Sequence, residues 1–266
     1  MAARFRQRGV RVSIDSNGGS AEMGRSLDEL QFLLTVEHAL IVEYLSICCA
    51  LGHDLRTQDG GPSTQSARDA ANAANNLAAG QMLRVASLAR ALHRAGRFVA
   101  FGRARSISDA ATGTDISLDP PSREQLEQML DREESIAAAI DARYAQVESW
   151  LGVAGGISDE LLEAVRDGTT HRRAVPILRD HLGAEPVGPL LRATRRFGAT
   201  EPEQVLARIS NRAYGDVVTA LAAFYGDLDG ASSGDFRLAA LGFMDQVNDA
   251  NRALVHAGLL PQFRLP

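Results

Sequence analysis

The segment LTVEHALIVEYL, residues 34–45, places acidic residues within an apolar helical pattern. Steps of three and four residues through this region select one row of side chains: Leu30, Leu34, Glu37, Ile41, Tyr44, Cys48 and Leu51. Residues at this spacing share one face of an α-helix, so Glu37 is predicted to face the core. A carboxylate in that position needs a metal, a cation or a hydrogen-bond donor, because burying an isolated charge is very unfavourable.

A later helical pattern repeats this arrangement. Its row of side chains also contains one acid: Leu126, Leu130, Glu133, Ala137, Ile140, Tyr144, Val147 and Leu151. Two helices are therefore expected to direct one carboxylate each, Glu37 and Glu133, into the same interior. The alternative is that these acids lie on solvated faces, because Glu43 and Glu134 are further acids on the same helices.

Composition narrows the class of protein. Hydrophobic residues make up 45% of the 266 residues and charged residues 23%, which indicates a well-buried globular chain. The net charge of −5 leaves no broad basic surface, so nucleic acid is not expected as a partner. All 28 basic residues are Arg, which excludes a lysine Schiff base.

The cysteines and the lack of a targeting pattern indicate a compartment. Adjacent Cys48 and Cys49 suit thiols in a reducing compartment. With no signal peptide and no uninterrupted apolar run of membrane-spanning length, we expect a cytoplasmic protein with no membrane partner.

Capping boxes and glycines divide the chain into helices. The capping boxes are Ser26 with Glu29, Ser122 with Gln125 and Thr200 with Glu203; a further helix begins near Ser158, and Gly52, Gly96 and the pair Gly155 and Gly156 end helices. The expected helices are 26–51, 66–95, 122–151, 158–182, 200–225 and 235–256. Residues 1–25 are expected to form an N-terminal arm with a possible short strand at 10–14, and residues 26–266 a single helical domain. A long connection, residues 97–121, would link two helix pairs.

The second and fourth expected helices add further polar side chains. Gln81 and Arg84 align with leucines on the second helix, although a solvated edge is the alternative for this pair. His171 lies on an apolar row of the fourth helix, where a hydrogen-bonded core histidine is the alternative to a functional one.

The run at residues 34–45 resembles the first helix of bacterial ferritin-like domains related to iminophenyl-pyruvate dimer synthase, from violacein-type natural-product pathways. The resemblance extends over about residues 26–260 and includes the third-helix acid and an Asp-Gly-x-x-His run at residues 167–171. It implies an all-α, ferritin-like four-helix bundle with additional C-terminal helices. It also implies a di-iron site, in which two helices each supply one Glu and two others each supply a Glu-x-x-His pair.

This chain departs from that ligand set. Glu37 and Glu133 match the two single acids, but Gln81 and Arg84 replace the Glu and His of the second-helix pair. His171 remains in the fourth helix, yet Gly168 stands three residues before it. Arginine cannot coordinate a cation and its charge repels one. We therefore predict that no metal cofactor is bound, and that Arg84 neutralises Glu37 and Glu133.

Three functions follow from the resemblance. The first is a metal-depleted enzyme of specialised metabolism that performs acid–base chemistry on a small, amino-acid-derived or aromatic substrate. His171, Glu37 and Glu133 would be catalytic, with His171 as general acid or base. The substrate-binding residues would be Arg84, Gln81, Tyr44 and Tyr144, although either tyrosine alone fits a core aromatic equally well.

The second function is an iron- or manganese-dependent oxidase or oxygenase with altered ligands. Glu37, Glu133 and His171 would then bind the metal, and His38, Glu43 or Asp167 would replace missing ligands. The third is a non-catalytic helical partner protein whose polar core fixes the helix register. We also expect a homodimer, because residues 217–224 and 238–244 form nearly continuous apolar faces.

Overall fold

The computed structural model describes residues 16–51, 62–104, 123–154, 158–168, 180, 195, 198–230 and 232–265. Within these residues the chain forms helices and no strand. The helices are α1 (Ser16–Ala50), α2 (Pro62–Arg94), α3 (Arg123–Ala154), α4 (Asp159–Gly168), α6 (Glu201–Gly226) and α7 (Ser233–His256). The predicted all-α class is confirmed.

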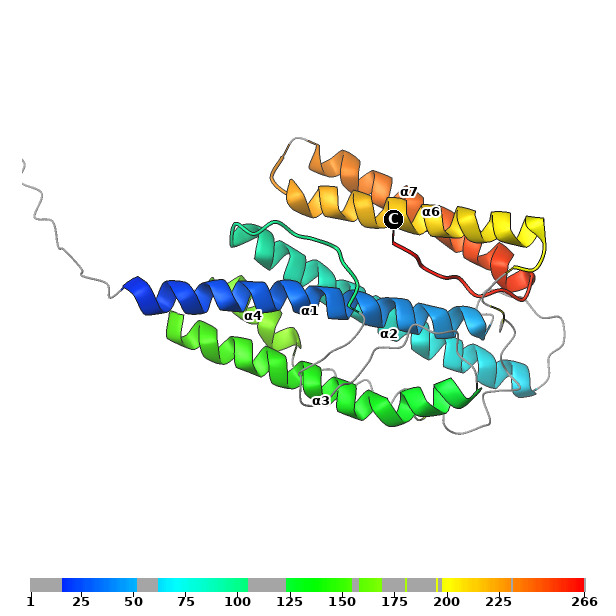
Figure 1. Ribbon diagram of the computed structural model, residues 1–266, viewed down its shortest axis with the longest axis horizontal. Helices are drawn as coiled ribbons and strands as arrows, with labels where there is room; N and C mark the ends of the chain where they lie inside the picture. The colour runs from blue at the N-terminus through cyan, green and yellow to red at the C-terminus, as the bar shows by residue number, and fades with distance from the viewer. Residues whose placement is uncertain are drawn as a thin grey trace, which may run out of the picture.

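The helices lie in three layers (Figure 1). α1 packs against α2 and α3, and the short α4 packs against the same two helices, so these four surround one core. α6 and α7 form an antiparallel hairpin on the other side of α1 and α2, with contacts from α6 to α2 and from α7 to α1. α1 and α2 therefore border both the core and the hairpin.

Burial along α1 reflects this central position. Leu30, Leu33 and Leu34 are fully buried, and each buried leucine contributes about 1.5–3 kcal/mol through the hydrophobic effect. Of the described helices, α1 alone has the length and composition to cross a membrane, but 72% of its most apolar window is buried in the protein. Such burial is typical of a helix at the centre of a helical core.

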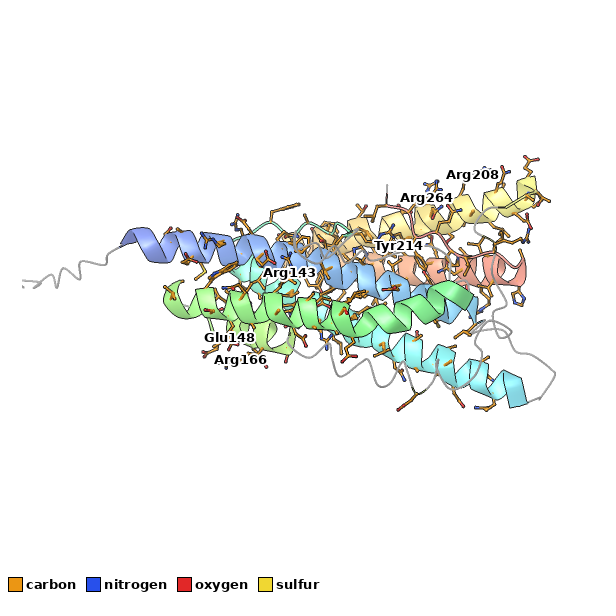
Figure 2. All side chains as sticks on the ribbon, turned by 60° about the horizontal axis from the view of Figure 1, so that its bottom comes forward. Arg143, Glu148, Arg166, Arg208, Tyr214 and Arg264 are labelled. Atoms are coloured by element: carbon orange, nitrogen blue, oxygen red, sulfur yellow. The ribbon has the colours of Figure 1, made fainter. Side chains whose placement is uncertain are left out.

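Ion pairs join neighbouring helices at the rim of the core (Figure 2). Arg143 on α3 reaches Glu29 on α1 at 2.5 Å and lies over the ring of Phe32 at 4.9 Å. Arg166 on α4 reaches Glu148 on α3 at 2.9 Å. The Arg166 pair is exposed and contributes little to stability, so packing dominates.

The start of α1 differs from the prediction. α1 begins at Ser16, whereas a capping box at Ser26 predicted a start at residue 26. Ser26 lies inside the helix and its hydroxyl donates to the Glu22 carbonyl at 2.8 Å, so it caps nothing. Gly19 explains the extension, because a Cβ there would lie 2.9 Å from the Ala154 carbonyl oxygen of α3. Residues 1–15, with the predicted strand at 10–14, lie outside the described residues.

The predicted end of α2 and the predicted start of α4 are confirmed, whereas α2 begins at Pro62 and not at the predicted residue 66. α2 ends before Gly96, whose φ of 75° suits glycine, and the amides of Gly96 and Arg97 bond back to the His93 and Leu92 carbonyls at 2.9 Å. At the start of α4, the Ser158 hydroxyl accepts from the Leu161 amide at 3.2 Å. The predicted continuation of this helix to residue 182 falls mostly outside the described residues.

A short extended segment, residues 97–104, lies along α1 and begins the predicted long connection. The side-chain amide of Gln31 donates to the Ala100 carbonyl at 2.7 Å, and the backbone amide of Ala104 donates to the Thr35 carbonyl at 3.0 Å. The segment also contacts the hairpin, because the rings of Phe101 and Tyr225 lie 5.7 Å apart. Residues 105–122 of the connection are not described.

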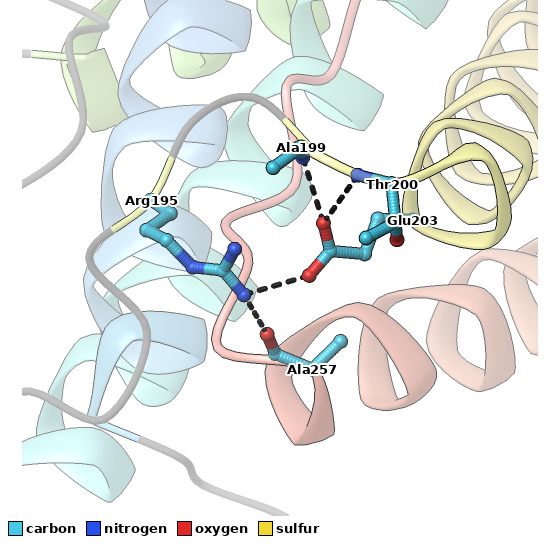
Figure 3. Close-up of polar contacts among 5 residues, drawn as sticks. All are labelled: Arg195, Ala199, Thr200, Glu203 and Ala257. Carbon is cyan, nitrogen blue, oxygen red and sulfur yellow. Dashed lines mark hydrogen bonds and ion pairs between the residues drawn. The ribbon is translucent and has the colours of Figure 1, made fainter.

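Arg195 fastens the open end of the hairpin (Figure 3). Its guanidinium donates to Glu203 at 2.8 Å and to the Ala257 carbonyl at 2.5 Å, linking the first turn of α6 to the end of α7. Glu203 also accepts from the Ala199 and Thr200 amides at 2.7 and 3.0 Å, which confirms the predicted capping role of Glu203. The backbone bond from Thr200 and then the Arg195 bond lower the pKa of Glu203 to about 2.

Candidate functional site

A hydrogen bond between Tyr144 of α3 and Glu37 of α1 lies at the centre of the four-helix core. The Tyr144 hydroxyl donates to Glu37 Oε1 at 2.8 Å, and both side chains are fully buried. Burial, followed by the negative charge of Glu37 and this bond, raises the pKa of Tyr144 well above its usual value. The prediction that Glu37 faces the core is confirmed, and its partner in this bond is a phenol.

α2 contributes the predicted Gln81 and Arg84 to the same region. Gln81 is 2% exposed, and the half-buried Arg84 donates to its Oε1 atom at 3.0 Å. The charge of Arg84 opposes the rise in the pKa of Tyr144. The prediction that Arg84 neutralises Glu37 stays a prediction. Tyr44 is also buried, on α1 within the same apolar core.

The fourth helix meets this site at Gly168. A Cβ added at this glycine would lie 2.3–2.4 Å from three atoms of the Tyr144 ring, far closer than real side chains approach. The Tyr144 ring therefore fills the space that a residue-168 side chain would enter. In the ligand pattern implied by the resemblance, position 168 carries a glutamate, and the structure leaves no room for it.

Two predicted residues cannot be placed. The side chain of Glu133 and the whole of His171 lie outside the described residues, so their proposed roles stay predictions. In the described part of the chain, no group of three or more His, Cys, Asp and Glu side chains lies close enough together to hold a metal ion. With Gln81, Arg84 and Gly168 at three of the ligand positions that the resemblance implies, the side chains present do not fit the di-iron set that it implies.

A second polar cluster, which the sequence did not predict, centres on His38. Its Nδ1 atom lies 2.8 Å from the Gly102 carbonyl and its Nε2 atom lies 2.6 Å from the Tyr214 hydroxyl. A carbonyl only accepts, so Nδ1 carries the hydrogen and Nε2 accepts from Tyr214. Tyr214 projects from α6 toward α1 (Figure 2). Both ring nitrogens of His38 are therefore hydrogen-bonded at the hairpin interface, which disfavours its suggested use as a replacement ligand beside Glu37.

Electrostatics at this second cluster differ from those in the core. Burial lowers the pKa of His38, and the charge of Arg103 lowers it further against the opposing effect of the Gly102 bond. Burial raises the pKa of Tyr214 to about 12 although Arg103 opposes the shift. The adjacent residues Glu37 and His38 thus enter two separate polar clusters, because side chains of consecutive helical residues point about 100° apart.

Comparisons with protein-family models, with curated proteins and with solved structures found no match to this chain. The geometry of the two clusters is therefore the basis for a functional proposal.

Proposed function

We propose that the chain is an enzyme of specialised metabolism whose ferritin-like core has lost its metal ligands and performs acid–base chemistry on a small substrate. The observation that carries the proposal is the buried Tyr144–Glu37 bond, together with the charge of Arg84, which acts on the same phenol. An acid, a phenol and a guanidinium from three helices together provide a proton acceptor, a donor that orients it, and an anchor for an anion.

Each residue has a distinct role in this proposal. Arg84, held by Gln81, binds the carboxylate of an amino-acid-derived or aromatic substrate. Glu37 accepts a proton from the substrate carbon, and Tyr144 holds the carboxylate in position through its hydrogen bond. His171 serves as the second acid or base near neutral pH, as the resemblance suggests.

A direct test is proton exchange at carbon. Phenylpyruvate serves as a probe because it carries a carboxylate, an aromatic ring and exchangeable hydrogens next to a carbonyl. The metal-stripped protein is expected to accelerate deuterium incorporation, followed by NMR, above the buffer rate. Glu37→Gln is expected to lower this acceleration by about a hundredfold, the usual contribution of a positioned base.

The matched control is a substitution elsewhere on α2. Arg90 is exposed, so Arg90→Gln removes an equal charge and is expected to leave the exchange rate unchanged, whereas Arg84→Gln weakens substrate binding. Metal analysis of the purified protein accompanies the assay. Stoichiometric iron or manganese, with exchange that depends on it, would contradict the proposal.

A structural role for the polar core is the second candidate, because Glu37 and Tyr144 are completely buried. A buried pair of this kind fixes helix register without any catalysis. In that case Glu37→Gln lowers thermal stability, and no probe exchanges faster than in buffer. Measuring stability and exchange on the same variants distinguishes the two functions.

A further inference from the structure

The imidazole of His38 joins three segments that are distant in the sequence. Its two nitrogens bond to Gly102 of the segment along α1 and to Tyr214 of α6. His38 is 6% exposed and Tyr214 is 7% exposed. The ring of Phe101 lies edge-on to the imidazole, with centroids 6.4 Å apart. A single side chain on α1 therefore holds the hairpin at this point.

The segment after α7, residues 259–265, covers the same interface. Phe263 is 1% exposed, its ring lies edge-on to that of Tyr214, and its carbonyl accepts from Arg103 at 2.5 Å. The φ of Phe263 is 45°, in the left-handed region that non-glycine residues disfavour, so this position is strained. Asn211 of α6 secures the segment by accepting from the Arg264 amide at 3.1 Å. The strain is maintained by the surrounding contacts.

The groups around His38 disfavour its protonation. The packed elements contribute the hydroxyl of Tyr214, the ring of Phe101 and the cation of Arg103. Tyr214 itself lies in an apolar cluster with Val42, Val218 and Phe263. On α1 itself the neighbouring acids are Glu37, bonded in the core, and Glu43. A protonated imidazole would be buried beside a guanidinium, and Nε2 could no longer accept from Tyr214.

We propose that His38, Tyr214 and Arg103 form a proton-sensitive lock that fastens the α6–α7 hairpin and residues 259–265 to α1. While His38 is neutral the lock is closed. When His38 is protonated, its acceptor is lost, its charge repels Arg103, and the strained Phe263 is released together with the hairpin. The core of α1–α4, to which α6 adds Tyr225, is built mostly from other contacts and keeps its structure. The lock is independent of the proposed enzyme function.

The direction of the pH effect follows from the lowered pKa of His38. An unfolded or released chain takes up the proton near the ordinary value of 6.5, whereas the closed lock takes it up only at lower pH. The contribution of the lock is therefore fully present above about pH 6.5 and is lost as the pH falls below that value.

Hydrogen exchange measured by mass spectrometry on the full chain tests the proposal at about pH 7.5 and pH 5.5. After correction for intrinsic rates, peptides from α6 and from residues 259–265 are expected to exchange about tenfold faster at the lower pH. Peptides from α2 and α3 are expected to change much less. Equal acceleration in every helix, or none in α6, would overturn the lock.

Three variants separate the parts of the lock. His38→Gln keeps a donor and an acceptor but cannot be protonated, so the pH difference in α6 is expected to disappear. Tyr214→Phe is expected to increase exchange in α6 at both pH values. Arg103→Gln removes the repulsion and is expected to reduce the pH difference. If His38→Gln fails to fold, an unchanged pH difference in Arg103→Gln contradicts the proposal.

Cys49 provides an independent measurement. Its half-buried side chain packs against the cluster of Ala50, Val255 and Leu260, which is formed by the ends of α1 and α7 and the segment after α7. Hairpin release is expected to increase its reaction with 4,4′-dithiodipyridine, a reagent that works in acid. Cys49→Ser gives the background from Cys48. Reactivity that stays constant between the two pH values would contradict release.

Discussion

The core and the hairpin interface contain two similar hydrogen bonds with different acceptors. In the core the Tyr144 hydroxyl donates to a carboxylate at 2.8 Å, and at the interface the Tyr214 hydroxyl donates to an imidazole at 2.6 Å. The two acceptors, Glu37 and His38, are neighbours on α1. A carboxylate acceptor makes a charge-assisted bond, whereas an imidazole stops accepting once it is protonated. The comparison indicates a permanent bond in the core and a releasable one at the interface.

The largest expected effect is on packing in the core. Gly168→Ala places a Cβ within 2.3 Å of the Tyr144 ring, and such overpacking is expected to lower the free energy of unfolding by about 3 kcal/mol. Urea denaturation measures the change. Gly152→Ala on α3 is the matched control, because nothing lies within 4 Å of its Cβ and alanine favours the helix. Equal effects of the two substitutions would mean that the ring does not require Gly168.

The next effect tests the carboxylate bond. Tyr144→Phe keeps the ring against Gly168 but removes a donor to buried Glu37, so a loss of about 2 kcal/mol in the free energy of unfolding is expected. Urea denaturation at pH 7.5 gives the value. If Tyr144→Phe lowers the free energy of unfolding by less than Tyr214→Phe does, the core bond is the weaker of the two.

The interface bond should contribute less. Tyr214→Phe removes a donor to neutral His38, and a loss of about 1 kcal/mol is expected at pH 7.5, because neutral acceptors make weaker bonds. Repeating the measurement at pH 5.5 sharpens the contrast, since protonated His38 no longer accepts from the hydroxyl. The difference between wild type and variant should then shrink. An unchanged difference would show that His38 stays neutral at that pH.

The smallest effect concerns the contact between Arg195 and Glu203, which links the first turn of α6 to the end of α7. The pKa of Glu203 falls from 4.5 to about 2 on folding, so its contribution is present above pH 4.5 and is lost as the pH falls toward 2. Glu203→Gln is expected to lower the thermal midpoint slightly at pH 7, with the difference from wild type vanishing toward pH 2. Glu201→Gln, in the same helical turn, is the control. A difference that vanishes already at pH 6 would assign the effect to another group.

Local sequence signals accounted for much of the fold. Gly96, Ser158 and Glu203 mark helix ends through bonds to backbone groups a few residues away, so the sequence predicts them well. The predicted helix start at Ser26 was wrong because the same residue pattern also occurs inside helices. The earlier start of α1 depends on close approach between Gly19 and α3, which no local pattern encodes.

Sequence periodicity alone determined that Glu37 is buried, because residues spaced by three and four share a helix face whatever that face contacts. The tertiary structure decided the partners. Tyr144 lies 107 residues from Glu37, and Tyr214 lies 176 residues from His38. Which donor meets which acceptor depends on the rotation of each helix and on the layer it occupies. Both are set by the packing of the whole chain, so adjacent residues of α1 became parts of two different clusters.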